Sequence, residues 1–202
     1  MVRVDADALY RLLRALASLG IFVETTDARF EMTPAATLLQ RNTPGSLRSA
    51  AMLYGDELLW RSFGRMLYAI ETGRPAFEYV YGQPFYDYLG EHPESAMLFH
   101  EAMTGFSEME SEAIIAACDV SQIRTVVDVG GGQGALIAAL LRAHQHLEAV
   151  IFDRSGPTPD TQNNFAIADI AGRARFIQGD FFNQVPDGGD LYLLKSILQQ
   201  LG

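Results

Sequence analysis

Residues 125–136 read TVVDVGGGQGAL, and this stretch decides the fold of the chain around it. Its first part is a β-branched run that suits a buried strand, because such side chains pack well on a pleated surface. The glycines at 130, 131, 132 and 134 end that strand, and apolar residues at helical spacing follow from Leu136. The order strand, glycine turn, helix predicts a loop whose backbone comes close to a ligand at the helix N-terminus.

Asp128 is the exception inside this apolar strand. A carboxylate two residues before the first glycine can accept hydrogen bonds from the loop amides, or it can attract a cationic ligand group. The alternative interpretation is a tight strand-to-helix turn with no ligand. Four glycines in five positions after a strand favour the ligand-binding loop.

The sequence after Asp119 alternates between strand and helix patterns. The predicted strands are residues 125–129, 149–152, 174–177 and 191–194, with helices after the first and the second. This alternation is typical of an α/β fold with a parallel sheet and right-handed crossovers, in which ligands bind at the carboxyl ends of the strands. The residues at those ends are the glycine loop, Asp153, Gly179-Asp180-Phe181 and Lys195.

The part of the chain before residue 119 is predicted to be mostly helical. A leucine stripe over residues 9–19 indicates an amphipathic helix, and residues 21–24 and 29–32 are predicted to pair as a hairpin. Thr33-Pro34 then places a capping hydroxyl and an N1 proline before a short helix. Helix, hairpin and short helix suggest a winged-helix unit, which serves either DNA binding or packing and dimerisation.

Two further stretches are helical in pattern. Residues 56–72 carry apolar side chains largely on one side, and Pro93 opens a long helix that runs to about Cys118. The long helix and the aromatic segment 77–89 are rich in Met, Phe and Tyr. Such side chains suit either a pocket for a flat apolar substrate or an ordinary core.

Composition limits the classes of partner and compartment. The chain has 202 residues, 49% of them hydrophobic, and a formal net charge of −10. Residues 1–48 hold six Arg and five acidic residues, whereas the remainder holds nine basic and twenty acidic residues. This balance disfavours nucleic acid as a partner, so packing is the favoured role of the winged-helix segment. A lone Cys118 and the lack of a membrane-length apolar run predict a soluble cytoplasmic protein, and no metal site is predicted.

The strand-end residues distinguish two adenosine cofactors. Asp153 lies 19 positions after Gly134, where a carboxylate can accept hydrogen bonds from both ribose hydroxyls. Asp180 is placed to accept from the adenine amine, with Phe181 against the ring. S-adenosylmethionine carries a sulfonium and an ammonium but no phosphate, so an acidic rim favours it. The pattern Gly130-x-Gly132-x-x-Ala135 also fits NAD, which the loop alone does not exclude.

Four motifs resemble those of the S-adenosylmethionine-dependent O-methyltransferases of the plant caffeate and bacterial polyketide type. They are VVDVGGGQGAL at 126–136, VIFD at 150–153, QGDFF at 178–182 and YLLKSIL at 192–198. DADALYRLLRALASLGIF at 5–22 is similar to the winged-helix dimerisation domain of that family. The resemblance implies a helical dimerisation and substrate-lining domain over 1–118 and a partial Rossmann-like cofactor domain over 119–202.

The resemblance also implies roles for individual residues. It assigns Gly130 and Gly132 to the cofactor loop, Asp153 to the ribose, Asp180 and Phe181 to the adenine, Lys195 to the far side of the cofactor, and Met103 and Phe106 to the substrate. The implied activity is methyl transfer from S-adenosylmethionine to a hydroxyl of an aromatic or polyketide-like small molecule, by a homodimer.

The sequence departs from the family where a general base is expected. The family carries a His-Asp-Trp tripeptide after the LLKSIL strand, whereas this chain has Gln199-Gln200-Leu201. A glutamine amide takes up no proton near neutral pH, so the catalytic residue is unassigned, and His100 on the long helix is the substitute to test.

The sequence is also shorter than the family pattern at both ends. Four strands are predicted where the family sheet has seven, and the family places helices before residue 1. The chain is therefore expected to be an internal piece. Three rival interpretations stay open: a non-catalytic cofactor-binding relative, a winged-helix DNA-binding regulator, and a nicotinamide oxidoreductase.

Overall fold

The computed structural model describes residues 3–41 and 43–198. The chain divides into two compact units, Met1–Gly105 and Phe106–Gly202. The division falls inside the longest helix, α8 (Pro93–Ala117), whose predicted extent is confirmed to within one residue. Each unit has its own packing and is described separately.

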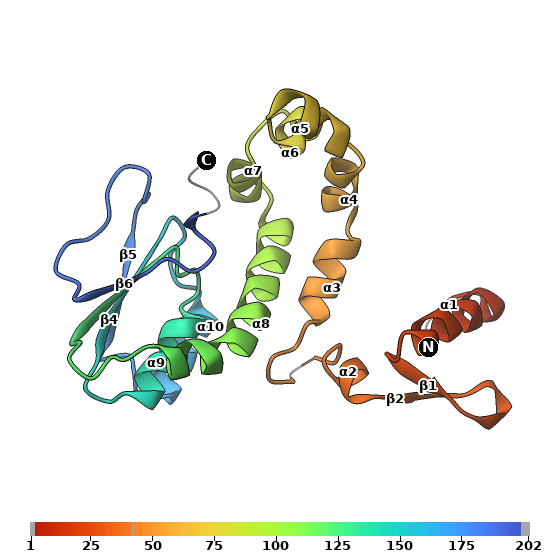
Figure 1. The fold of residues 1–202 in the computed structure, drawn as a ribbon, viewed down its shortest axis with the longest axis horizontal. Helices are drawn as coiled ribbons and strands as arrows, with labels where there is room; N and C mark the ends of the chain where they lie inside the picture. The colour runs from red at the N-terminus through yellow and green to blue at the C-terminus, as the bar shows by residue number, and fades with distance from the viewer. Residues whose placement is uncertain (1–2, 42, 199–202) are drawn as a thin grey trace. The chain divides into compact units, whose positions relative to one another are not determined.

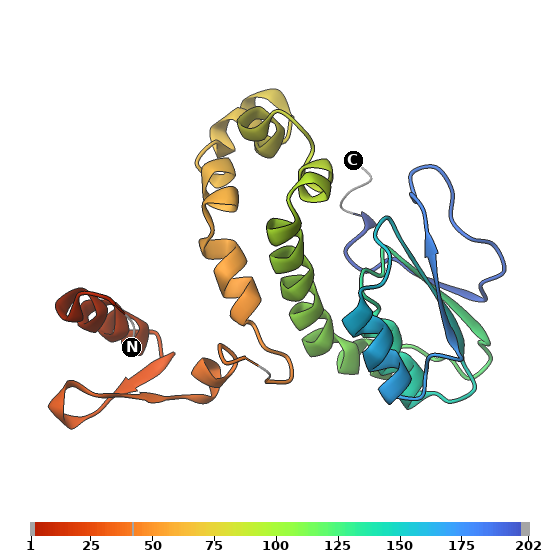
Figure 2. The ribbon, with the colours of Figure 1, turned by 180° about the vertical axis from the view of Figure 1, so that it is seen from behind.

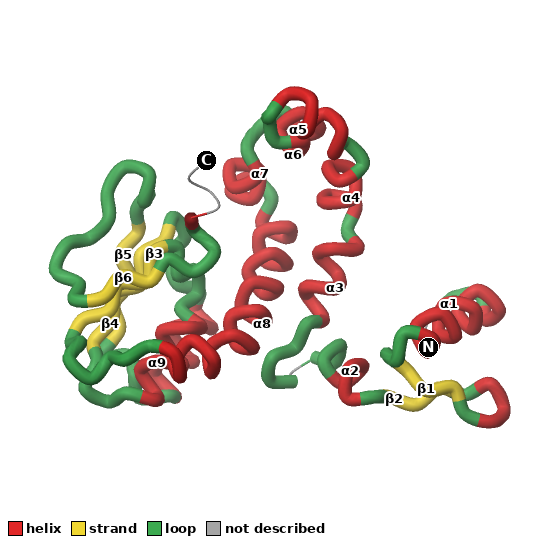
Figure 3. Tube along the Cα trace, viewed as in Figure 1, coloured by secondary structure: helices red, strands yellow, loops and turns green. Residues whose placement is uncertain are grey.

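The first unit is helical apart from one hairpin (Figure 1, Figure 3). Its elements before α8 are α1 (Ala6–Ser18), β1 (Phe22–Glu24), η1 (Thr26–Ala28), β2 (Phe30–Met32), α2 (Pro34–Thr37), α3 (Arg48–Gly55), α4 (Glu57–Phe63), α5 (Met66–Thr72), α6 (Ala76–Tyr81) and α7 (Phe85–Glu91). β1 and β2 pair antiparallel, and Thr33 Oγ1 accepts a 3.2 Å hydrogen bond from Ala36 N at the start of α2. The predicted hairpin and capped short helix are thus confirmed.

Polar contacts join α1 to the hairpin. The Tyr10 hydroxyl donates a 2.6 Å hydrogen bond to one oxygen of Glu24, and Arg14 Nε lies 3.3 Å from the other. The leucine stripe itself is not covered within the described chain, since Leu12 is 56% exposed and Leu19 is 75% exposed.

Residues 56–72 differ from the single helical pattern that the sequence predicts. They form two helices, α4 and α5, because the chain leaves the helix at Gly64 and re-enters it after Arg65. Their large apolar side chains lie on the surface at exposures between 47% and 73%: Trp60, Phe63, Met66, Leu67 and Ile70. This face has no covering element among the described residues of its unit.

The aromatic segment forms a core inside the first unit. Phe77 is 9% exposed, and its ring centroid lies 4.5 Å from that of Tyr81, 5.0 Å from that of Phe85 and 5.5 Å from that of Tyr88. Edge and tilted contacts of this kind stabilise ring pairs beyond the burial of area. For these four rings, the structure shows mutual packing within the unit, as expected of an ordinary core.

The second unit contains a four-stranded parallel sheet. Its strands are β3 (Thr125–Val129), β4 (Glu148–Asp153), β5 (Ala174–Gln178) and β6 (Leu191–Leu193), in the spatial order β5-β4-β3-β6. α9 (Ala135–Ala143) follows β3 and α10 (Pro159–Ile167) follows β4 (Figure 2). All four predicted strands are confirmed to within one residue at either end. Strand order reverses between β3 and β6, and ligands of such sheets bind at that switch point.

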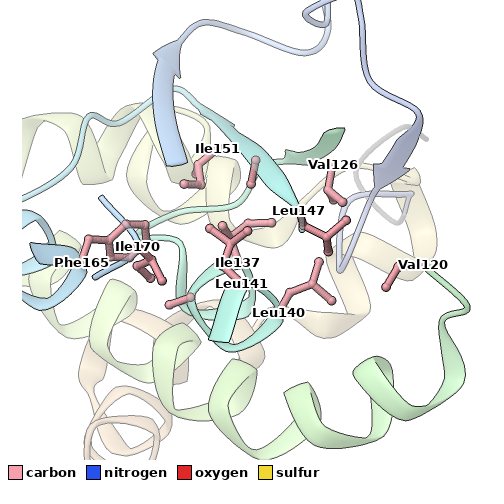
Figure 4. Close-up of a cluster of buried hydrophobic side chains, with 11 residues drawn as sticks. Val120, Val126, Ile137, Leu140, Leu141, Leu147, Ile151, Phe165 and Ile170 are labelled. Atoms are coloured by element: carbon pink, nitrogen blue, oxygen red, sulfur yellow. The ribbon is translucent and has the colours of Figure 1, made fainter. Parts of the chain in front are cut away.

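The core of the second unit lies on the face of the sheet that α9 covers (Figure 4). Val126 of β3 and Ile151 of β4 pack there with Ile137 and Leu141 of α9, and all four are fully buried. A smaller cluster on the other face includes Val127, Val129, Val150 and Phe152. Burial of β3 on both faces fixes the strand from which the glycine loop leaves. Within the described residues, no helix has the length and apolarity that crossing a bilayer requires.

Candidate cofactor site

The glycine loop joins β3 to α9 at the carboxyl edge of the sheet. Gly130, Gly132 and Gly134 have φ angles of 68°, 55° and 77°, which glycine adopts without the strain of a Cβ. Gly130 N donates a 2.7 Å hydrogen bond to Phe152 O, and Gly134 N donates a 2.9 Å bond to Gly131 O. The loop is therefore bonded to the end of β4 as well as turned back on itself.

Two neighbouring glycines of this loop face different surroundings. A Cβ on Gly131 would lie 2.7 Å from Asp128 Oδ2 and 2.9 Å from Ile151 Cγ2, so this position has no room for a side chain. A Cβ on Gly132 would meet nothing within 4 Å. Gly131 thus packs inward on the sheet, while Gly132 presents its backbone to open space, as close approach of a ligand requires.

Asp153 at the end of β4 holds the loop. Its Oδ2 accepts a 2.9 Å hydrogen bond from Gly132 N, and its Oδ1 accepts from the Ser155 amide at 2.9 Å and the Ser155 hydroxyl at 2.8 Å. One of the two roles that the sequence predicts for Asp128 is to accept hydrogen bonds from the amides of the glycine loop. Among the described residues that role belongs to Asp153, because Asp128 lies beneath the loop rather than beside its open face.

The end of β5 lies beside the end of β4. Gly179 N donates a 2.9 Å hydrogen bond to Asp153 O, and Asp180 Oδ1 accepts one of 2.9 Å from Phe182 N. Phe181 packs on the sheet face opposite α9, and a Cβ on Gly130 would lie 3.8 Å from its Cε1. The structure therefore brings Asp153 and Phe181 to the glycine loop, and Asp180 lies between Gly179 and Phe181 in the segment after β5.

Lys195 follows β6, on the other side of the switch point. Its Nζ donates a 3.0 Å hydrogen bond to Glu110 Oε2 on α8, and its side chain is 23% exposed. Two residues on, Ile197 is buried and fills the space over Gly130. Lys195 is thus held in place rather than fully solvated, and Glu110 is a site residue that the sequence analysis missed.

The buried Asp128 has an unusual electrostatic environment. Burial raises the pKa of its carboxyl to about 7, the ammonium of Lys195 opposes this rise, and the carboxylate of Asp153 adds to it. The group is 3% exposed. Asp190, at the opposite end of β3, shows the reverse effect: hydrogen bonds from the amides of Thr125 and Arg124 lower its pKa.

Gln133 is a second residue that the sequence analysis missed. Its Oε1 accepts a 2.9 Å hydrogen bond from Thr158 N and one of 2.7 Å from the Thr161 hydroxyl. These bonds tie the glycine loop to the segment between β4 and α10. No sequence pattern marks this role, because the partners lie 25 and 28 positions away.

Three further residues that the sequence proposes for the site, His100, Met103 and Phe106, lie on α8. Met103 and Phe106 are both half-buried on α8. Met103 and His100 belong to the first unit, whereas the glycine loop belongs to the second. Gln199, at the position of the family's general base, lies outside the described residues. The assignment of Met103 and Phe106 to the substrate and the choice of His100 as the substitute to test therefore stay predictions, and the catalytic residue stays unassigned.

A parallel sheet with a glycine loop at its switch point and carboxylates at successive strand ends defines a ligand-binding domain of the α/β class. The chain belongs to the O-methyltransferase domain family, whose family model matches residues 63–201. The chain is 41% identical over 196 residues to the O-demethylpuromycin-O-methyltransferase of Streptomyces alboniger, covering 96% of this chain and 52% of that protein.

Solved structures agree with this family. The crystal structure of LaPhzM superposes with a TM-score of 0.84 at 37% identity, covering 94% of this chain and 57% of that one. NcsB1 from neocarzinostatin biosynthesis, solved with S-adenosyl-L-homocysteine and 1,4-dihydroxy-2-naphthoic acid, gives a TM-score of 0.70 at 32% identity, covering 94% of this chain and 58% of that one. The fold class is thereby confirmed. The chain spans about half the length of the curated relatives that it matches.

Proposed function

We propose that this chain binds S-adenosylmethionine over the glycine loop and takes part in methyl transfer to a hydroxyl of an aromatic or polyketide-like small molecule. The observation that carries the proposal is that Asp153 joins the glycine loop to the segment after β5, through the bonds that it accepts from Gly132 N and Gly179 N. The proteins that the chain resembles carry names of O-methyltransferases in antibiotic and phenazine chemistry.

The residues present fit this cofactor better than a dinucleotide. Three carboxyl groups lie at or beneath the strand ends, at Asp128, Asp153 and Asp180. They would repel the pyrophosphate of NAD, whereas S-adenosylmethionine is cationic at its sulfonium and ammonium and carries no phosphate. The open space over Gly132 suits the close approach of an amino-acid tail.

Each residue has a role in binding and orienting. Asp153 accepts hydrogen bonds from Gly132 N and from Ser155, and Asp180 accepts one from Phe182 N. The lone pairs that remain can accept from a ribose hydroxyl at Asp153 and from an adenine amine at Asp180. Phe181 supplies an apolar face for the adenine, and Lys195 supplies a cation for the carboxylate of the cofactor. When bound, the cofactor supplies an activated methyl group on sulfur, and the protein aligns it with the acceptor oxygen. Met103 and Phe106 are assigned to the acceptor by the family resemblance alone.

The proposal also includes a cellular compartment and an oligomeric state. We place the protein in the cytoplasm, which suits its single, half-buried Cys118. We also assign it a homodimer, supported by the exposed apolar faces of α1 and of α4 with α5. Surfaces of this kind mark protein–protein contacts when the apolar residues are contiguous.

Calorimetric titration of the chain with S-adenosylmethionine, S-adenosylhomocysteine and NAD tests the cofactor. We expect the first two to bind and NAD not to bind. Asp153→Asn, which keeps the shape but loses the charge, should weaken S-adenosylmethionine by roughly tenfold or more, in line with loss of a charged hydrogen bond. Asp187→Asn, on an exposed loop residue, is the matched control and should leave the affinity unchanged. Binding of NAD alone would overturn the proposal.

A further inference from the structure

The carboxyl group of Asp128 lies inside the sheet, directly beneath the glycine loop. Asp128 pairs in register with Ile151 of β4 and Leu193 of β6, and it is 3% exposed. Its Oδ2 lies 2.7 Å from the position that a Cβ on Gly131 would occupy. The carboxyl group is therefore separated from the open side of the loop by little more than the backbone of Gly131.

The charged groups that face Asp128 leave it without a dedicated partner. β4 contributes the carboxylate of Asp153, and β6 contributes the ammonium of Lys195. Lys195 in turn donates its 3.0 Å bond to Glu110 of α8, and within the described residues no cation lies within ion-pair distance of Asp128. The ammonium of Lys195 is thus shared between Asp128 and Glu110. An ionised Asp128 would be a buried and under-compensated charge, which is costly.

We propose that Asp128 is a proton-linked counter-charge of the cofactor site. When a ligand that bears a sulfonium and an ammonium binds over the loop, the O–H bond of the Asp128 carboxyl breaks and its proton passes to solvent. When the ligand leaves, the carboxylate takes a proton back from solvent. The inference rests on the proposed function, because it requires a cationic ligand at this loop.

The electrostatics of the ligand-free chain agree with this exchange. Burial raises the pKa of Asp128 to about 7, so that about half of the molecules carry the proton at neutral pH. A bound cation favours the ionised form and lowers that pKa. By linkage, the ligand affinity of the wild type relative to that of Asp128→Asn then rises with pH, by about tenfold between about pH 6 and about pH 8.

Calorimetry of S-adenosylmethionine binding in two buffers of different ionisation enthalpy counts the protons released. At neutral pH the wild-type chain should release about half a proton more per ligand bound than Asp128→Asn, which cannot ionise, and the ratio of their affinities should show the tenfold rise. The α-ammonium of the ligand also titrates in this range, but it does so equally with both chains. The matched control is Asp190→Asn, just before β6, whose carboxylate accepts hydrogen bonds from the amides at the start of β3; it should behave as the wild type.

Two results would overturn the inference: an Asp128→Asn chain that releases as many protons as the wild type on binding the ligand, or a ratio of the two affinities that does not change with pH. If neither S-adenosylmethionine nor S-adenosylhomocysteine binds, the proposed function fails instead. Carboxyl ¹³C NMR of the ligand-free chain then measures the pKa of Asp128. Its signal is identified as the one that is missing from Asp128→Asn. A titration midpoint near neutral pH supports the inference, and one near the ordinary value of an aspartate contradicts it.

Discussion

Asp128 links the stability of the sheet to pH through one buried carboxyl group. Because its pKa is about 7 when folded and near 3.8 when exposed, the folded chain holds its proton over a pH range in which the unfolded chain has lost it. The stabilisation is complete below the unfolded pKa and is lost as the pH rises through the folded pKa.

We therefore expect the free energy of unfolding of the wild type, relative to Asp128→Asn, to fall between about pH 4 and about pH 7. Urea denaturation of both chains across this range measures the difference. Because each other titrating group is shared by the two chains, a constant difference would show that Asp128 is ionised in the folded chain.

Gly131 tests how tightly the loop packs on this carboxyl group. Gly131→Ala would place a methyl group 2.7 Å from Asp128 Oδ2 and 2.9 Å from Ile151 Cγ2. We expect a loss of about 1 to 3 kcal/mol in the free energy of unfolding, as overpacking typically costs, together with weaker S-adenosylmethionine binding. Gly172→Ala has open space and serves as the control, within about 0.5 kcal/mol of the wild type. Equal stability of the two variants would show that the loop does not rest on the carboxyl.

The site was only partly predictable at this scale. The glycines, Asp153 and Asp180 were identifiable because each follows a recognisable strand, and strand ends meet at one edge of a parallel sheet. Glu110 was not, because it meets Lys195 across 85 positions of sequence and on a different kind of element. The depth of Asp128 was likewise hidden, since a strand pattern does not tell which polar residue the loop above it covers.

At the scale of the elements, Arg173 donates hydrogen bonds to carbonyl groups at and just beyond the carboxyl end of α9. Arg173 Nη2 donates a 2.9 Å hydrogen bond to Leu141 O, and its Nη1 donates to the carbonyls of His144, Gln145 and Leu147 at 3.2, 3.4 and 3.3 Å. The last carbonyls of a helix lack partners within the helix, and a cation also interacts favourably with the helix dipole there. Arg173 therefore connects the end of α9 to the start of β5.

Arg173→Met should lower the free energy of unfolding by about 1 to 3 kcal/mol, since it removes charged hydrogen bonds to half-buried carbonyls. Arg175→Met, on an exposed residue of β5, removes the same charge and should cost much less. Urea denaturation compares them. If both variants lose the same stability, the capping role of Arg173 is wrong.

The elements of the second unit were easier to predict than those of the first. A β-branched run marks β3, short apolar runs that alternate with helical patterns mark β4 to β6, and burial on both faces of β3 follows from its apolar composition. In the first unit, the same apolar periodicity suggested one helix over 56–72. It failed there because helical spacing shows which side chains share a face but not what covers that face, and Gly64 interrupts the helix.

At the scale of the whole molecule, large apolar side chains on the surface of the first unit bear on its assembly. Leu67 and Ile70 on α5 are 66% and 73% exposed. If this face is covered in a homodimer, Leu67→Glu should shift the chain from dimer to monomer in light scattering after size-exclusion chromatography. Arg74→Glu, just beyond α5, is the control for added negative charge. A wild-type chain that elutes as a monomer at every concentration would contradict the homodimer.

Hydrogen exchange on addition of S-adenosylhomocysteine tests the central claim, that successive strand ends form one binding site, most directly. We predict slower exchange of the amides in 130–134, 153–155 and 179–182, because these backbone segments are bonded to one another through Asp153 and lie where the ligand binds. Binding that leaves these three segments unchanged, or that protects only one of them, would contradict it.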